Sequence, residues 1–395
     1  MSKLLDRTSV RPVRKHTAFT NRFMKITRRS ALLLGGVLAL ILVAAATSYG
    51  LFHSSAPKLP VVTLSDGVTA PKDMAWIPGG EFMMGSDHKL AQRNERPAHL
   101  VRVHGFWMDQ THVTNDQFAQ FVKETGYQTT AERKPDWETI RVQLPPGIPK
   151  PPDKVLVPGA MVFVGTDRPV NLNDASQWWQ YVPGASWRHP QGPKSDIEGK
   201  GDYPVVQVSY EDAQSYARWA GKRLPTEAEW EFAARGGLNQ ATYAWGDQLM
   251  PEGKPQANYW DIQKQPFPVI GNGQASSMRI KVGTTPVRSF PQNGYGLYDM
   301  TGNAWQWIAD WYRADYFVLQ LQQSGKDAID NPQGPADSFD PSDRTAPLDA
   351  PKRVIRGGSF LCNEDYCMSY RPSARRAQDP YSGMSHVGFR LVKNQ

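Results

Sequence analysis

The chain contains two cysteines, Cys362 and Cys367, and both lie near its C-terminus. Four residues separate them, in the sequence LCNEDYC. A lone cysteine pair in an exported protein usually forms a disulfide. Two thiolates can also bind Cu(I), a soft ion that few sulfur ligands satisfy. The spacing is compatible with both, so the pair is either a structural crosslink or a candidate redox or copper site.

Other patterns that carry enzyme chemistry are missing from the sequence. The eight histidines include no HxxxH pair, and no Gly-rich dinucleotide loop, P-loop or GxSxG elbow occurs. Hydride transfer, P-loop phosphate chemistry and hydrolase-type acyl transfer therefore have no support. Asn303 and Gln306 lie in an aromatic stretch. There they either form a structural corner or offer oxygen ligands to a hard cation such as calcium.

The charge of the chain is concentrated at its N-terminus. The whole sequence has a net charge of +7, which by itself would suggest a nucleic-acid partner. Residues 1–30 carry nine basic side chains and one acidic side chain, which leaves 36 basic and 37 acidic residues in 31–395. The body of the protein is electrically neutral, and we expect no nucleic-acid partner.

A run of apolar residues and glycine, ALLLGGVLALILVAAA, occupies residues 31–46 directly after the basic segment. This order is typical of a signal peptide or a signal anchor, and Arg28-Arg29 resembles a twin-arginine export signal. We expect residues 1–50 to target the chain and residues 51–72 to be a linker. The body is then exported, either periplasmic or anchored in the inner membrane outside the cytoplasm.

Helix caps and alternating patterns predict the elements that position these residues. Each predicted helix begins at a Ser or Thr N-cap and ends near a glycine. The predicted helices follow Thr114, Ser209 and Thr226 and end near Gly126, Gly221 and Gly236. The predicted strands lie in residues 74–85, 99–109, 354–360 and 387–392, and the longest loops are 144–159 and 324–351. Together they predict one loop-rich α+β domain over residues 73–395.

A series of motifs in this body resembles the formylglycine-generating enzyme family, or sulfatase-modifying factors. The motifs are PGGEFMMG (78–85), GFWMD (105–109), VTN (113–115), PVVQVS (204–209), KRLPTEAEWE (222–231), NGYGLYDMTGNAWQW (293–307), RGGSF (356–360) and GFR (388–390). The resemblance covers residues 73–395. It implies a C-type-lectin-like α+β architecture with little regular secondary structure.

The family's active-site stretch, GGSxxCxxxYC, is present from Gly357 to Cys367. The resemblance implies a copper-dependent oxidase that uses O2 to convert a cysteine in a CxPxR-type motif of a sulfatase polypeptide to formylglycine. Cys362 and Cys367 would hold Cu(I), and the substrate thiolate would join them as a third sulfur ligand. The implied residues for hydrogen bonding or substrate binding are Ser359, Tyr366, Trp305 and His386.

The resemblance also implies two calcium sites, where this sequence departs from the family. The second site would consist of Asp299, Gly302, Ala304 and Gln306. Relatives usually have glutamate where Gln306 stands, so calcium affinity should fall. The first site would begin at Asn258 and Tyr259, but its second half falls in 271–282, where the sequence diverges. Residues 363–365, between the cysteines, include two acids that either alter substrate preference or face solvent.

Two other functions stay open at this point. The chain is either an exported relative that uses this fold for another maturation step, for example on a siderophore or a peptide, or a non-enzymatic lectin-like binding module. In the binding module Cys362 and Cys367 would form a structural disulfide.

Overall fold

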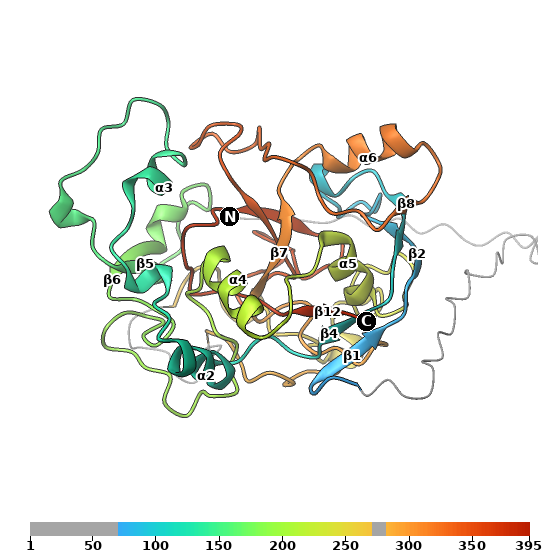
Figure 1. The fold of residues 1–395 in the computed structure, drawn as a ribbon, viewed down its shortest axis with the longest axis horizontal. Coiled ribbons are helices and arrows are strands. Elements are labelled where there is room, and N and C mark those ends of the chain that lie inside the picture. Colours follow the sequence, from blue (N-terminus) through green and yellow to red (C-terminus); the bar gives the residue numbers. More distant parts are fainter. Residues whose placement is uncertain (1–69, 271–281) are drawn as a thin grey trace, which may run out of the picture. The chain divides into compact units, whose positions relative to one another are not determined.

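The computed structural model describes residues 70–270 and 282–395 (Figure 1). Short strands and short helices alternate with long loops in this part of the chain, which confirms the predicted α+β class. The predicted targeting segment, most of the predicted linker and most of the second half of the first calcium site lie outside the described residues. None of the helices within 70–270 and 282–395 is long and apolar enough to cross a membrane.

The strands of the described residues form four small sheets. Their bounds are β1 Met74–Ile77, β2 Gly80–Met84, β3 His99–Val103, β4 Phe106–Asp109, β5 Gly159–Phe163, β6 Trp179–Pro183, β7 Trp305–Trp311, β8 Ile329–Asp330, β9 Arg353–Arg356, β10 Arg375–Gln378, β11 Val387–Gly388 and β12 Val392–Asn394. The sheets have the orders β10-β9-β7-β11, β1-β4-β12, β2-β3-β8 and β5-β6. In the first of them β9 is antiparallel to both β10 and β7, and β11 is parallel to β7.

The helices are α2 Asn115–Thr125, α3 Trp137–Arg141, α4 Tyr210–Trp219, α5 Glu227–Arg235 and α6 Tyr316–Ser324. The three helices predicted from N-caps are confirmed as α2, α4 and α5. The side chains of Thr114, Ser209 and Thr226 each accept a hydrogen bond from the backbone three residues on, completing a capping box. Gly126 and Gly236 end α2 and α5 in the left-handed conformation.

Several predicted strands are wrong in their extent. Residues 99–109 form two strands that belong to different sheets and are separated by His104 and Gly105. A Cβ on Gly105 would lie 2.5 Å from the ring of Trp76. Residues 354–360 are a strand only as far as Arg356, and residues 387–392 are divided between β11 and β12. Helices α3 and α6 and the β5–β6 hairpin lie where the sequence predicts no element.

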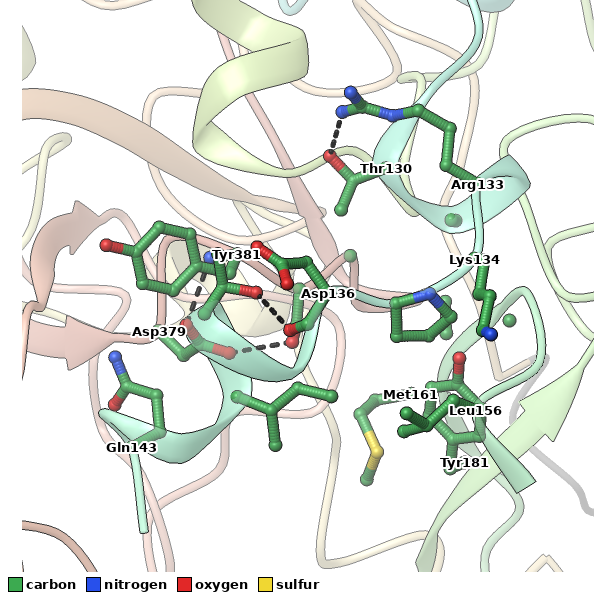
Figure 2. A pocket seen from close by; sticks show the side chains of 18 of the residues that line it. Thr130, Arg133, Lys134, Asp136, Gln143, Leu156, Met161, Tyr181, Asp379 and Tyr381 are labelled. Atoms are coloured by element: carbon green, nitrogen blue, oxygen red, sulfur yellow. Dashed lines mark hydrogen bonds between the residues drawn. The ribbon is translucent and has the colours of Figure 1, made fainter. Parts of the chain in front are cut away.

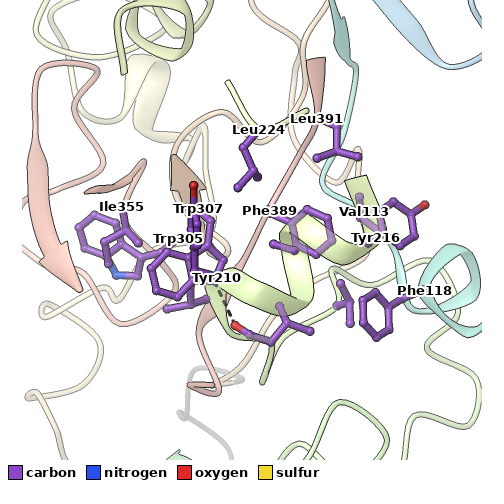
Figure 3. Close-up of a cluster of buried hydrophobic side chains, with 14 of the residues drawn as sticks. Val113, Phe118, Tyr210, Tyr216, Leu224, Trp305, Trp307, Ile355, Phe389 and Leu391 are labelled. Atoms are coloured by element: carbon purple, nitrogen blue, oxygen red, sulfur yellow. Dashed lines mark hydrogen bonds between the residues drawn. The ribbon is translucent and has the colours of Figure 1, made fainter. Parts of the chain in front are cut away.

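A hydrophobic cluster joins helices α2 and α4 to the β10-β9-β7-β11 sheet (Figure 3). The fully buried Phe118 of α2 contacts the rings of Trp187 (5.2 Å between centroids) and Tyr216 of α4 (5.8 Å). In Figure 3, Trp305 of β7 and Ile355 of β9 lie together at the opposite end of the cluster from Phe118. The cluster therefore fixes β7 and β9, which carry part of the candidate site.

A buried group of ion pairs ties α5 to β9 and β10. Glu227 of α5 accepts hydrogen bonds from Arg356 of β9 (2.8 Å) and Arg375 of β10 (2.7 Å), and Glu231 accepts one from Arg356 (2.6 Å). These four side chains have no exposed surface. Burial raises the pKa of Glu227, but the two guanidinium groups outweigh it, and the net pKa is lowered. Residues 357–374, which contain both cysteines, connect β9 to β10, so these ion pairs fix both ends of that segment.

Asp310 of β7 is buried beside Glu227 and accepts a hydrogen bond from its backbone N–H (3.0 Å). Burial and the charge of Glu227 raise the pKa of Asp310 to about 8. Since an unfolded aspartate has a pKa of about 3.9, the folded state keeps a proton that the unfolded state releases, and stability falls as pH rises from about 4 to about 8.

We expect Asp310→Asn to abolish this loss of stability with rising pH. In urea unfolding, the stability of the variant relative to wild type should increase with pH across this interval, and a constant difference would contradict the assignment.

Candidate active site

The two cysteines lie on the segment that connects β9 to β10. Their Cα atoms are 4.8 Å apart, and their sulfur atoms are joined in a disulfide. Cys362 is buried and Cys367 is half-buried. The two thiolates that the resemblance implies are the reduced form of this disulfide, whereas the binding-module alternative requires the disulfide itself. At this separation both sulfurs, once reduced, can reach one soft ion.

Asn363 holds the backbone between the cysteines. Its side-chain Oδ1 accepts hydrogen bonds from the N–H groups of Asp365 (3.0 Å) and Tyr366 (2.9 Å). Its carbonyl oxygen accepts two more, from the N–H groups of Cys367 (3.2 Å) and Met368 (2.8 Å). Asn363 is fully buried, while the two acidic residues after it are exposed. The loop is therefore held in shape by hydrogen bonds that do not involve the sulfur atoms.

Two glycines turn the chain from β9 toward the cysteines. Gly357 (φ 93°) and Gly358 (φ 71°) have left-handed backbones, and a Cβ on Gly357 would lie 2.6 Å from a backbone carbonyl oxygen. Ser359 follows them and is fully buried. Its Oγ accepts a hydrogen bond from the N–H of Leu361 (3.3 Å), and its carbonyl oxygen accepts one from the N–H of Cys362 (2.9 Å). Ser359 thus supports the turn that places Cys362.

A cavity of about 330 Å³ lies beside the two cysteines. The residues predicted for catalysis or substrate binding, which are far apart in the sequence, all line it: Cys362, Cys367, Ser359, Tyr366, Trp305 and His386. The other lining residues are Trp179, Phe267, Ile355, Leu361, Arg376, Ala377, Gln378 and Met384. The structure brings the predicted residues together, and their individual roles stay predictions.

Strand pairing places Trp305 and His386 next to each other. Val387 of β11 lies opposite Trp305 of β7, and the Trp305 N–H donates a hydrogen bond to the carbonyl oxygen of His386 (2.9 Å). The His386 ring packs on Trp179 (4.7 Å between centroids). Burial lowers the pKa of His386 to about 3, so the ring is neutral at physiological pH. Its buried Nδ1 has no hydrogen-bond partner in the described part of the chain.

Tyr366 lies between aromatic rings at the cavity wall. Its ring stacks on Phe267 (5.0 Å) and meets Trp178 edge to face (5.7 Å). Burial raises the pKa of Tyr366, and the positive charge of Arg376 opposes this only in part. The phenol is therefore protonated at physiological pH and can donate a hydrogen bond into the cavity.

Arg376 and Gln378 are cavity residues that sequence patterns do not reveal. Both lie on β10, where side chains alternate between the two faces of the strand. Arg375 points to the buried ion pairs, so its neighbour Arg376 points to the other face and the cavity. Arg376 also lies opposite Ile355 of β9, another cavity residue. Only the pairing of β10 with β9 identifies this face, because the sequence shows two adjacent arginines.

The residues implied for the second calcium site are Asp299, Gly302, Ala304 and Gln306. Gln306 Oε1 accepts hydrogen bonds from Trp230 Nε1 (2.8 Å) and Arg390 Nε (2.7 Å). The carbonyl oxygen of Ala304 accepts one from the buried His112 ring (2.9 Å). Two of the four implied ligand groups are thus already bound to N–H donors.

Arg390 supplies the positive charge in this corner. Its guanidinium is fully buried and donates to the carbonyl oxygens of Asp109, Gln110, Tyr298 and Asp299 at 2.7–3.2 Å. Of the implied ligand oxygens, this cationic side chain binds Gln306 Oε1. In this arrangement Gln306 Oε1 and the Ala304 carbonyl oxygen already accept hydrogen bonds, so the second calcium site stays a prediction and we derive no step through calcium.

The residues that begin the implied first calcium site are engaged in local structure. Asn258 Nδ2 donates hydrogen bonds to Gly283 (2.9 Å) and to Asn303 Oδ1 (3.2 Å), and its carbonyl oxygen accepts one from the Asn303 N–H (2.8 Å). Asn303 is therefore a structural corner. Tyr259 packs on Tyr370 (4.9 Å between ring centroids). Most of the rest of this site lies outside the described residues, so the first site stays a prediction.

Metal binding at the candidate site rests on the cysteine pair. Within residues 70–270 and 282–395, no group of three or more His, Cys, Asp and Glu side chains is placed to hold a metal ion. Two sulfur ligands suit a soft, low-coordinate ion and leave other positions open to a substrate. The donor set therefore fits Cu(I) better than a hard cation.

A second cavity, of about 560 Å³, lies next to the 379–383 segment (Figure 2). In Figure 2, Asp379 and Tyr381 lie on the opposite side of this cavity from Lys134. The Asp379 carboxylate accepts hydrogen bonds from the Tyr381 N–H (3.0 Å) and the Ser382 hydroxyl (2.7 Å). None of the described residues that line this cavity is a cysteine, so it offers no counterpart to the thiol chemistry of the first.

Comparisons with known proteins agree on one family. The sequence profile of the "sulfatase-modifying factor enzyme 1-like domain" matches residues 62–395. The chain is 45% identical over 317 residues to the formylglycine-generating enzyme of Mycobacterium tuberculosis, which covers 80% of this chain and 96% of that protein. It is 43% identical over 324 residues to that of Thermomonospora curvata, which covers 81% and 93%. The structure of PvdO from Pseudomonas aeruginosa has a TM-score of 0.50 at 21% identity, covering 85% of this chain and all of that one, a likeness of fold alone.

Proposed function

Because the chain belongs to the formylglycine-generating enzyme family of sulfatase-modifying factors, we propose that it converts a cysteine in a CxPxR-type motif of a sulfatase polypeptide to formylglycine. Like these close relatives, it is an O2-dependent oxidoreductase. The observation that carries the proposal is the position of Cys362 and Cys367 at the wall of a 330 Å³ cavity. That cavity has the size of a small ligand site and is lined mainly by apolar and aromatic side chains.

The electron balance of this reaction requires a reductant. Conversion to formylglycine removes two electrons from the cysteine Cβ and replaces sulfur by oxygen, whereas reduction of dioxygen to the level of water takes up four. One substrate cysteine, one dioxygen and two thiols therefore give one formylglycine, one hydrogen sulfide, one water and one disulfide. The same thiol reductant opens the Cys362–Cys367 disulfide by exchange.

Copper fits the donor set, and the residues around it have separate tasks. Cys362 and Cys367 would hold the ion through their thiolates. When bound, copper would supply the one-electron chemistry with dioxygen that these side chains lack. Trp305 walls the cavity and excludes water, and the neutral phenol of Tyr366 donates a hydrogen bond to the substrate peptide. Ser359 holds the turn that places Cys362.

The N-terminal sequence supports a location outside the cytoplasm. Residues 1–30 are basic and residues 31–46 are apolar, an order typical of an export signal or anchor. The enzyme would then meet its sulfatase polypeptide after export, attached to the inner membrane if the segment is not cleaved.

A peptide assay tests the proposal. The reduced protein is incubated with a CxPxR peptide, Cu(I), O2 and a thiol, and the aldehyde is detected by mass spectrometry and hydrazide labelling. We expect aldehyde only when copper, O2 and thiol are all present, and none from the matched SxPxR peptide. Absence of aldehyde with copper-loaded, reduced protein would contradict the oxidase and favour another maturation role. A Cys362–Cys367 disulfide that resists thiols under native conditions would instead favour the binding module.

His386 provides a second test of the cavity. Because burial keeps its ring neutral, we infer that it acts as a hydrogen-bonding group toward the peptide and not as a charge. We expect His386→Leu to lower kcat/KM about 30-fold, the cost of leaving a hydrogen-bond partner unsatisfied. The control His386→Asn keeps a hydrogen-bonding group and should lose less than about fivefold. Equal losses in the two variants would indicate that only the shape of the ring matters.

A further inference from the structure

Arg376 is the one charged side chain among the described residues that line the cysteine cavity, since His386 is neutral. Within the described part of the chain its guanidinium makes one hydrogen bond, a long one from Nη2 to the carbonyl oxygen of Cys367 (3.4 Å), and it has no ion-pair partner. A guanidinium carries five N–H donors in a fixed plane. Most of these donors are therefore free to bind a group that enters the cavity.

Among the described residues, the nearby arginines Arg371 and Arg375, unlike Arg376, are both paired with carboxylates. Arg371 forms two hydrogen bonds with the carboxylate of Glu95 (2.6 and 2.7 Å), and Arg375 forms two with that of Glu227 (both 2.7 Å). Each of these buried cations is neutralised by a carboxylate within the chain. Arg376 faces a cavity whose described lining contains no carboxylate. Within residues 70–270 and 282–395 the guanidinium therefore has no carboxylate partner and is left to solvent or a ligand.

We propose that Arg376 determines substrate specificity by binding the carboxylate of an Asp or Glu next to the reacting cysteine in the substrate polypeptide. This inference rests on the proposed function. A carboxylate can accept two parallel hydrogen bonds from a guanidinium, and aromatic walls that exclude water strengthen such a pair. Arg376 contacts the carbonyl oxygen of Cys367, one of the two cysteines proposed to hold copper, so a carboxylate bound by Arg376 lies beside the proposed copper site.

The cavity offers further support for a flanking side chain as the occupant. Its volume of about 330 Å³ exceeds what a single cysteine side chain fills, so part of it is left for a neighbouring residue. Gln378 lines the same cavity from the same face of β10 and can donate a second, neutral hydrogen bond. Arg376 and Gln378 together offer hydrogen-bond donors to an acidic side chain in the cavity.

Binding of non-reacting peptides tests the inference separately from catalysis. Fluorescent SxPxR peptides carry Asp, Asn or Lys directly before or after the serine, and dissociation constants are measured by fluorescence anisotropy without copper. We expect wild-type protein to bind an Asp peptide about tenfold more tightly than its Asn counterpart at low salt, and less so at high salt. Arg376→Gln should abolish this preference, and Arg376→Glu should reverse it toward Lys. Arg344→Gln, at an exposed position outside the cavity, is the matched control and should retain it.

The outcomes separate the inference from the proposed function. Equal affinities for Asp and Asn peptides, or a preference that survives in Arg376→Gln, would overturn the role of Arg376. If such a protein still oxidises CxPxR peptides, the proposed function stands without it. A charge preference that follows the Arg376 variants while no peptide is oxidised would leave the inference standing and contradict the oxidase. Thermal unfolding of each variant verifies that it is folded.

Discussion

Replacing Cys362 by serine is expected to lower the rate of formylglycine formation about 1,000-fold or more, and Cys367→Ser should cost about the same. The two sulfur atoms are adjacent in the structure and would bind one ion as a unit. Loss of either thiolate leaves a single sulfur ligand, and removal of the second then changes little. We therefore expect the double variant to be no slower than either single variant, measured as single-turnover aldehyde formation.

Asp365→Asn is the matched control for this prediction. Asp365 is exposed in the same loop, and its backbone N–H, which the substitution keeps, donates to Asn363. Its activity should stay within about twofold of wild type, as is usual for surface substitutions of small effect. If Cys362→Ser or Cys367→Ser retained a tenth or more of the wild-type rate, the proposal that both thiolates hold one copper ion would be wrong. Copper titration of each variant measures loss of the ion, and thermal unfolding shows whether the variant is folded.

Glu227→Gln is expected to destabilise the fold by about 3–5 kcal/mol. Glu227 pairs with two fully buried arginines, and the amide would leave Arg375 without a carboxylate partner and Arg356 with Glu231 alone. Because Arg356 and Arg375 flank the cysteine-bearing segment, the variant should also lose oxidase activity at temperatures where wild type is stable. Urea unfolding at neutral pH measures the change directly.

Glu81→Gln is the contrasting control for the buried ion pairs. Glu81 forms an ion pair with Arg102, but both side chains are about half exposed. Exposed pairs of this kind contribute about 0.2–1 kcal/mol, because water screens the charges and the side chains lose entropy on pairing. A loss in Glu227→Gln as small as that in Glu81→Gln would show that Glu227 is not essential to the scaffold. Acidification should act in the same direction as Glu227→Gln, because a lowered carboxylate pKa contributes stability that is lost as pH falls.

Helices that carry their own capping signals could be predicted from the sequence. Thr226 and Glu229 form local hydrogen bonds that mark the start of α5, so no distant residue is needed to place it. Helix α6 has no such signal, because Asp315 at its N-terminus makes no capping hydrogen bond. Strand β7 is buried on both faces along most of its length, so its sequence lacks the alternation that marks a half-buried strand. These elements depend on their tertiary neighbours.

The candidate site could be predicted only as far as family resemblance reaches. The spacing of Cys362 and Cys367 leaves both a crosslink and a metal site open, with a disulfide the usual outcome for a lone pair, and the surrounding motif favours the metal. Arg376 stayed hidden because its direction depends on the pairing of β10 with β9. The partner of Gln306 is hidden for a similar reason, since the side chain accepts a hydrogen bond from Arg390, which follows it by 84 residues. Contacts between residues so far apart in the chain leave no local pattern in the sequence.

The hydrogen bonds of Asn363 determine how the cysteines can exchange a metal ion. Since the side chain and carbonyl of Asn363 hold the turn, we expect its shape to persist when the sulfurs are no longer bonded to each other. Ordering a flexible loop costs about 1–2 kcal/mol of conformational entropy per residue. Here the loop is already ordered in the folded protein, so metal binding does not have to order it. We expect the ion to enter and leave by rotation of side chains alone, which makes loading a rapid local equilibrium set by thiol and copper concentrations.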